Sequence, residues 1–165
     1  MKNIVLIGMM GCGKTTVSKL LAEKLVREVI DIDEYLVHKY QMSIPEMFDI
    51  SEDYFRKRET ICCQEIGQLE NTIVSTGGGV IKNHINIKAL HENGMIFYLD
   101  RPIDNIYQDV DIASRPLLKD GPEKLYELYY ERHQLYLDSC DYHVMNDQTL
   151  DDVVEKIIKL YQESK

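Results

Sequence analysis

The sequence predicts one doubly wound α/β domain, in which helices cover both faces of a parallel sheet. Its 165 residues suit a single domain. Short β-branched runs alternate with longer helical patterns, and the strand candidates carry apolar residues on both faces. The chain has no internal repeat, low-complexity segment or linker-like stretch, so we expect the domain to span residues 1–165.

Five short apolar or β-branched runs are predicted as strands. The first follows the N-terminal Met and Lys and is typical of a fully buried strand, whereas the second is weaker. The predicted strands are residues 3–7, 28–31, 71–76, 94–100 and 141–145.

Four longer segments are predicted as helices because their apolar residues recur at helical spacing. The second of them has Ser51 as a plausible N-cap with acidic residues in its first turn, and the third has Pro122 near its start. The predicted helices are residues 15–26, 51–69, 121–137 and 150–161.

Composition and charge exclude some classes of function. The net charge of −9 argues against a duplex nucleic-acid binder, which usually has a basic surface. The chain has no apolar run near the roughly 20 residues that span a bilayer, and we expect a cytoplasmic protein without a membrane partner. The four cysteines have no C-x-x-C spacing, so we expect reduced thiols rather than a zinc site or disulfides.

The segment from Gly8 to Thr15 matches the phosphate-loop pattern G-x-x-x-x-G-K-[ST]. Its glycines let successive backbone N–H groups turn around an anion, and the following helix adds its positive end. Lys14 is expected to contact the β- and γ-phosphates, and the hydroxyl of Thr15 to bind Mg²⁺. Cys12 is interpreted as a small residue that contributes only backbone contacts. The alternatives are a chance glycine turn or an anion site without chemistry.

Two carboxylates, Asp31 and Asp33, follow the second predicted strand. In an extended chain both side chains lie on one side, with Ile32 turned away. One carboxylate can hold a metal-bound water, and the other can accept a proton from an attacking alcohol. The alternative is that Asp33 is the N-cap of a helix over residues 34–40.

Arg56 and Glu59 are three residues apart on a predicted helix and therefore share a face. Glu59 can orient Arg56 toward an anionic group, and the planar guanidinium suits a carboxylate because it can bind both oxygens. The alternative is an ordinary surface salt bridge.

Three consecutive glycines, Gly77, Gly78 and Gly79, end the third predicted strand. They allow a ligand to approach the backbone closely, or they form a flexible connection. Arg115 follows a polar stretch and is a candidate for a mobile segment that closes over phosphates. Arg132 lies on a later predicted helix. Either arginine taken alone is a candidate for a solvated surface group.

Together these motifs resemble the shikimate kinase family over nearly the whole chain. The conjunction of D-x-D, F-R-x-x-E and the triple glycine at these separations is far more specific than the phosphate loop alone. The matching segments are 8–15, 31–33, 43–48, 55–59, 77–79, 115–118 and 132–136.

The resemblance implies a three-layer P-loop fold like that of nucleoside monophosphate kinases, with a five-stranded parallel sheet in the order 2-3-1-4-5. It also implies transfer of the ATP γ-phosphoryl group to the 3-hydroxyl of shikimate, a step toward chorismate and the aromatic amino acids. We expect a monomer with Mg²⁺ as cofactor, a substrate-binding region at about residues 32–60 and a lid at about 107–120.

The family also implies roles for individual residues. Lys14, Asp33 and Arg115 would be catalytic, with Asp33 as a candidate base, and Asp31 would hold Mg²⁺ through water beside Thr15. Ile44 and Phe48 would form an apolar wall. The expected ATP-binding residues are Gly11, Cys12, Gly13, Lys14, Thr15, Thr16 and Arg115, and the expected shikimate-binding residues are Asp33, Arg56, Gly77, Gly78, Gly79 and Arg132.

The sequence departs from the family near the expected adenine site. Basic residues that many members carry there are replaced at Gln108 and in the segment Asn146-Asp147-Gln148. We therefore expect weaker discrimination in favour of adenine. Two other functions stay open on sequence alone: a kinase of another sugar acid such as gluconate, and a nucleotide-binding module without catalysis.

Overall fold

The computed structural model describes residues 1–109 and 123–164, and five parallel strands in this part of the chain form one sheet in the order β2-β3-β1-β4-β5. This order confirms the predicted fold class. The strands are β1 (Asn3–Ile7), β2 (Val29–Asp31), β3 (Ile73–Ser75), β4 (Gly94–Asp100) and β5 (Tyr142–Met145).

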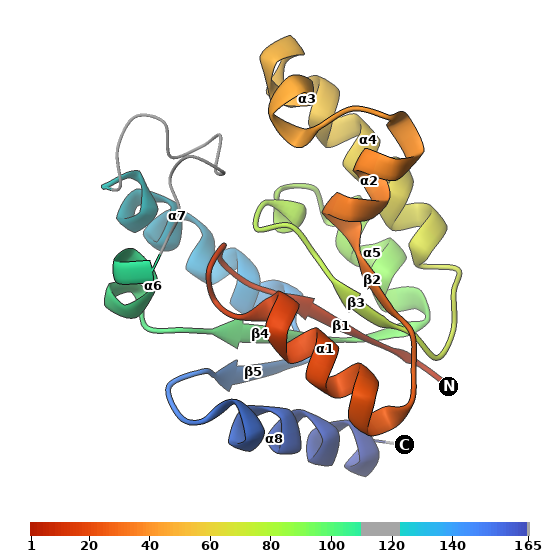
Figure 1. The fold of residues 1–165 in the computed structure, drawn as a ribbon, viewed down its shortest axis with the longest axis vertical. Coiled ribbons are helices and arrows are strands. Elements are labelled where there is room, and N and C mark those ends of the chain that lie inside the picture. Colours follow the sequence, from red (N-terminus) through yellow and green to blue (C-terminus); the bar gives the residue numbers. More distant parts are fainter. Residues whose placement is uncertain (110–122, 165) are drawn as a thin grey trace.

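Helices cover both faces of this sheet. Figure 1 shows α1 and α8 side by side on one face and α5 and α7 on the other, while α2, α3 and α4 form a group at one end of the molecule. The helices are α1 (Lys14–Leu25), α2 (Ile32–Tyr40), α3 (Ile44–Ile50), α4 (Glu52–Ile66), η1 (Val80–Lys82, a 3₁₀ turn), α5 (His84–Glu92), α6 (Ile103–Asp109), α7 (Lys124–Ser139) and α8 (Leu150–Glu163).

The hydrophobic core lies around the two central strands. Every residue of β1 and β4 is buried, and the two strands pair from Asn3 with Gly94 to Ile7 with Tyr98. Because parallel strands point the same way, their carboxyl ends meet at one edge of the sheet, which is where ligands bind in open α/β folds. The residues that follow the strands are therefore brought to a common edge.

The start of α2 corrects one prediction from the sequence. The chain does not stay extended through Asp33, because α2 begins at Ile32 and Asp33 lies in its first turn. Asp31 is the N-cap, and its side chain accepts a hydrogen bond from the backbone N–H of Glu34 at 3.1 Å. The alternative of Asp33 as the cap was therefore wrong.

Candidate active site

The phosphate loop is a tight turn between β1 and α1. Gly8, Gly11 and Gly13 have positive φ angles of 149°, 78° and 104°, a backbone region that other residues rarely adopt. The Nζ of Lys14 donates to the carbonyl oxygens of Gly8 at 2.5 Å and Met9 at 2.9 Å. Lys14 is therefore a nearly buried cation held at the centre of the loop.

Two residues support this loop from the ends of neighbouring strands: Arg101, which the sequence analysis did not single out, and Asn146, which it named only as a departure near the expected adenine site. Arg101, which directly follows β4, donates to the carbonyl oxygen of Gly11 at 3.0 Å. Asn146, which follows β5, donates through Nδ2 to the carbonyl oxygen of Cys12 at 2.8 Å. Cys12 itself is buried, and its N–H donates to the carbonyl oxygen of Met9. The positions of Arg101 and Asn146 immediately after strands were the signal that could have found them.

A cleft of about 360 Å³ opens in front of the loop, at the carboxyl edge of the sheet. Its walls bring five of the predicted ATP-binding residues (Gly11, Gly13, Lys14, Thr15 and Thr16) together with both carboxylates, while Cys12 does not line it. The lining residues are Met10, Gly11, Gly13, Lys14, Thr15, Thr16, Asp31, Asp33, Ser75, Thr76, Gly77, Gly78 and Arg101.

The chemistry of the cleft fits Mg²⁺. The Thr15 hydroxyl and the Asp31 carboxylate line the same space, and hard oxygen donors are the ligands that Mg²⁺ takes. In the described part of the chain no three His, Cys, Asp or Glu side chains lie close enough together to enclose a metal ion by themselves. This donor set fits an ion that keeps several waters and binds substrate phosphates rather than one enclosed by protein.

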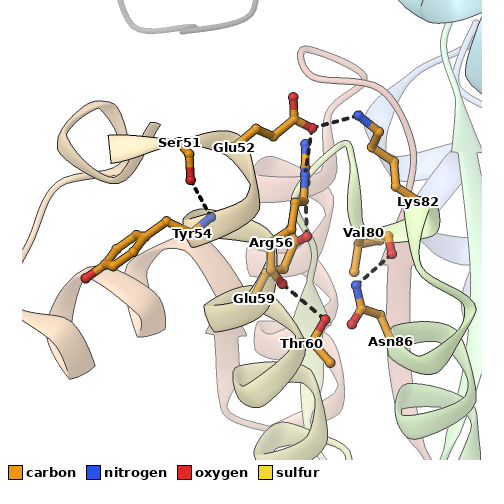
Figure 2. A network of polar contacts seen from close by, with 9 residues as sticks. All are labelled: Ser51, Glu52, Tyr54, Arg56, Glu59, Thr60, Val80, Lys82 and Asn86. Carbon is orange, nitrogen blue, oxygen red and sulfur yellow. Dashed lines mark hydrogen bonds and ion pairs between the residues drawn. The ribbon is translucent and has the colours of Figure 1, made fainter. Parts of the chain in front are cut away.

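Arg56 and Glu59 form a largely buried ion pair on α4. The guanidinium Nη1 of Arg56 donates to Oε1 of Glu59 at 3.0 Å, and Glu59 is 1% exposed. Figure 2 shows Glu52 one turn earlier, where its carboxylate accepts from Nε of Arg56 at 3.3 Å and from Lys82 at 2.7 Å. The alternative of a surface salt bridge was therefore wrong for Arg56 and Glu59.

Burial controls the charge of Glu59. Burial raises the pKa of its carboxyl above the usual range, and the adjacent Arg56 opposes that rise. Its second oxygen, Oε2, has no hydrogen-bond partner among the residues that the structure describes. This oxygen faces Gly77, close to Asp33, so Glu59 is held at the boundary between the cleft and α4.

Arg132 lies on α7 and is only 1% exposed. In the described chain none of its three guanidinium nitrogens has a hydrogen-bond partner. The interpretation as a solvated surface group was therefore wrong. A buried cation without hydrogen bonds is costly, and an anion in front of it would remove that cost.

The triple glycine is required by neighbouring side chains rather than by its backbone angles, because none of its residues has a positive φ. A Cβ at Gly79 would lie 2.4 Å from two guanidinium nitrogens of Arg56, and one at Gly77 would lie 3.2 Å from the Asp33 carboxylate. A Cβ at Gly78 would lie 3.4 Å from Nη1 of Arg132. The run therefore lets Arg56, Asp33 and Arg132 approach one short stretch of backbone.

The structure does not place every predicted residue. Arg115 and most of the predicted lid lie outside the described residues, as does Pro122. Arg56, Gly79 and Arg132 do not line the cleft itself but adjoin it at the glycine run. Ile44 and Phe48 are partly buried against the core, and the ring of Phe48 stacks on that of Phe55 with 4.6 Å between the ring centroids. Weaker adenine discrimination stays a prediction.

A phosphate loop at the edge of this sheet, facing two carboxylates and a pair of arginines, defines a P-loop kinase of a small anionic acceptor. The protein-family model described as "Shikimate kinase" matches residues 10–162 of this chain. A shikimate kinase of Clostridium botulinum (strain Alaska E43 / Type E3) is 44% identical over 97% of this chain and 98% of its own length. One of Caldicellulosiruptor bescii is 42% identical over 100% of this chain and 99% of its own.

Solved structures agree with these sequence matches. A shikimate kinase from Acinetobacter baumannii, solved in complex with shikimate, has a TM-score of 0.93 and 35% identity, with 100% of this chain and 95% of that chain covered. The enzyme from Aquifex aeolicus has a TM-score of 0.82 at 29% identity, over 98% of this chain and 97% of its own. The chain therefore belongs to the shikimate kinase family and is an enzyme with that family's activity.

Proposed function

We propose that this enzyme transfers the γ-phosphoryl group of ATP to the 3-hydroxyl of shikimate, with the site residues acting as follows. The observation that carries the proposal is the convergence of Arg56, Arg132 and Asp33 on the glycine run beside the phosphate loop. The shikimate-bound relative from Acinetobacter baumannii supports shikimate as the ligand. The product, shikimate 3-phosphate, leads toward chorismate and the aromatic amino acids.

The acceptor is held at its carboxylate by two arginines. Arg132 supplies a buried guanidinium without a hydrogen-bond partner in the described chain, and Arg56 supplies one that Glu59 and Glu52 orient. Charge-assisted bonds from planar guanidinium groups fix both the position and the orientation of a carboxylate. The backbone N–H groups of the glycine run contribute further donors. This clamp leaves the ring hydroxyls directed toward Asp33.

The donor phosphates lie in the phosphate loop, where backbone N–H groups from Gly11 to Thr16 and the start of α1 stabilise their charge. Lys14 exchanges the carbonyl oxygens of Gly8 and Met9 for the β- and γ-phosphates. Arg115, on the predicted lid, adds positive charge when the lid closes, and closure excludes water as a competing acceptor.

In the transfer step the shikimate hydroxyl oxygen forms a bond to the γ-phosphorus while the bond from that phosphorus to the bridging oxygen of ADP breaks. The hydroxyl proton passes to Asp33, the carboxylate next to the acceptor. The transition state is loose, so positioning and charge neutralisation supply most of the acceleration.

Mg²⁺ fits the oxygen donors of Thr15 and, through water, of Asp31, and when bound it neutralises charge on the β- and γ-phosphates.

We also propose that the enzyme is a cytoplasmic monomer. The four cysteines, all of which the structure describes, are free thiols, in keeping with a reducing compartment. No helix in the described ranges is long and apolar enough to cross a membrane.

A coupled assay of ADP release tests the function. With ATP and Mg²⁺ present, we expect ADP formation with shikimate, and mass spectrometry of the product should show one added phosphoryl group on the 3-oxygen. Gluconate and other sugar acids in the same assay test the rival acceptor. Turnover of gluconate without turnover of shikimate would contradict the proposal.

A further inference from the structure

Tyr136 lies between the proposed shikimate-binding residues and the phosphate loop, although its side chain lines no part of the cleft. The residue is fully buried on α7, and its hydroxyl donates a hydrogen bond to the carbonyl oxygen of Gly78. It follows Arg132 by one helical turn, so both side chains share a face of the helix. Both reach the same glycine.

Gly78 also lies close to the phosphate loop. A Cβ at this glycine would lie 3.4 Å from Nη1 of Arg132, 3.7 Å from the hydroxyl oxygen of Tyr136 and 3.4 Å from the backbone nitrogen of Met10. Helix α7, the glycine run and the phosphate loop therefore meet at one peptide. Movement of the Gly78 peptide would therefore change the distance between the residues proposed to bind the acceptor carboxylate and the phosphate loop.

The hydrogen bond from Tyr136 is what ties this peptide to α7. Within the described chain no guanidinium nitrogen of Arg132 has a hydrogen bond of good geometry, although its charge lies close enough to the Tyr136 hydroxyl to oppose the rise that burial causes in the pKa of that group. The ring of Tyr136 packs against the ring of Tyr98, with 4.9 Å between the ring centroids. The hydroxyl of Tyr98 is in turn hydrogen-bonded to Nδ1 of His133 at 2.9 Å. The aromatic support fixes where the Tyr136 hydroxyl points.

We infer that Tyr136 is a positioning residue, which holds the Gly78 peptide against Arg132 and so sets the geometry of the carboxylate clamp. The inference rests on the proposed function, because it assumes that Arg132 and Gly78 bind the acceptor. Tyr136 lines no part of the cleft, so it acts through Arg132 and Gly78 rather than by direct contact with a substrate. Its loss should therefore weaken shikimate binding more than ATP binding.

Tyr136→Phe isolates the hydroxyl, since the ring and its packing on Tyr98 are retained. We expect the KM for shikimate to rise about tenfold, the scale of one buried hydrogen bond, while the KM for ATP changes by less than about twofold. Tyr142→Phe is the matched control: it removes a hydroxyl bonded to Ser164, away from the cleft, and should leave both KM values unchanged. Thermal unfolding checks that each variant is folded.

A double-mutant cycle with Arg132→Lys separates positioning from general loss of stability. If Tyr136 acts through the clamp, Tyr136→Phe should raise the KM for shikimate much less in the Arg132→Lys background than in the wild type. A shift of less than about twofold in the single Tyr136→Phe variant, an equal rise in both KM values, or fully multiplicative effects would overturn the inference. An unchanged KM for shikimate in Arg132→Lys alone would overturn the proposed clamp as well.

Discussion

The guanidinium group of Arg56 lies directly against Gly79, where a Cβ atom would come within 2.4 Å of two of its nitrogens. This contact between α4 and the segment after β3 explains why a glycine is needed at position 79, since its backbone angles do not require one. Any side chain at this position must displace the guanidinium from its place beside Glu59.

Gly79→Ala should therefore damage acceptor binding while the fold survives, because the clash falls on the far end of a flexible side chain. We expect the KM for shikimate to rise by about tenfold or more, the scale of losing a charge-assisted contact, with little change in the melting temperature. Gly67→Ala is the contrasting control: its Cβ would lie 2.3 Å from the backbone oxygen of Ala89. That variant should lose stability and keep its KM, and the reverse pattern would refute the explanation.

Arg132→Met should separate binding from stability. Replacing a buried guanidinium that lacks hydrogen bonds in the described chain should raise the free energy of unfolding by about 1 kcal/mol, because burying a charged group without hydrogen bonds is destabilising. Shikimate should then no longer raise the free energy of unfolding. Chemical denaturation with and without shikimate measures both effects.

Arg27→Met provides the comparison for that experiment. Arg27 donates to the carbonyl oxygen of Lys2 at 3.3 Å and to the hydroxyl of Tyr161 at 3.1 Å, so its loss should lower stability and leave the response to shikimate intact. A large loss of stability in Arg132→Met would show that Arg132 is a structural residue instead.

The raised pKa of Glu59 gives activity and stability opposite responses to pH. As pH falls through this pKa, the carboxylate becomes neutral, the ion pair with Arg56 weakens, and kcat/KM for shikimate should fall. The folded state binds this proton more tightly than the unfolded state, so the free energy of unfolding contributed by Glu59 should decrease as pH rises from about 4.3 to the folded pKa, and then stay constant.

Glu59→Gln should remove both responses. Glu52→Gln is the matched control, because a hydrogen bond from Lys82 lowers the pKa of Glu52. Its contribution to stability is present above about pH 4.3 and is lost as pH falls through the lowered pKa, the opposite sign to Glu59. An identical acid limb of kcat/KM in the wild type and Glu59→Gln would contradict the assignment.

Asp33→Asn should lower kcat by about two orders of magnitude, the scale of general-base catalysis, with the KM for ATP nearly unchanged. Because the N-cap of α2 is Asp31, the melting temperature should also be nearly unchanged.

Asp31→Asn tests the proposed metal role: Asn still caps a helix, so stability should hold while the Mg²⁺ concentration needed for half-maximal rate rises. Stopped-flow or steady-state ADP release over a Mg²⁺ titration measures these effects, and a wild-type kcat in Asp33→Asn would exclude it as the base.

The sequence predicted the elements that carry long apolar patterns or strong caps. Ser51 caps α4 as expected, and β1 and β4 have their predicted bounds. The short helices α3, α5 and α6 were not predicted as elements, because a helix of seven to nine residues carries little periodicity. The S-x-x-E capping box from Ser43 to Glu46 was a readable signal for α3.

Site residues could be predicted where the spacing of residues along the chain determines their role. They could not be predicted where the role depends on contacts between distant segments. The phosphate loop and the pairing of Arg56 with Glu59 follow from spacing along the chain. Burial of Arg132 does not, because it depends on how α7 packs against the glycine run. The same holds for Asn146, whose contact with Cys12 joins segments 134 residues apart.

A crystal structure with shikimate, Mg²⁺ and a non-hydrolysable ATP analogue tests the central claim most directly. We expect the shikimate carboxylate between the guanidinium groups of Arg56 and Arg132, and its 3-hydroxyl beside Asp33 and in line with the γ-phosphate held by the phosphate loop. A bound acid whose carboxylate lies out of reach of both arginines would contradict the account.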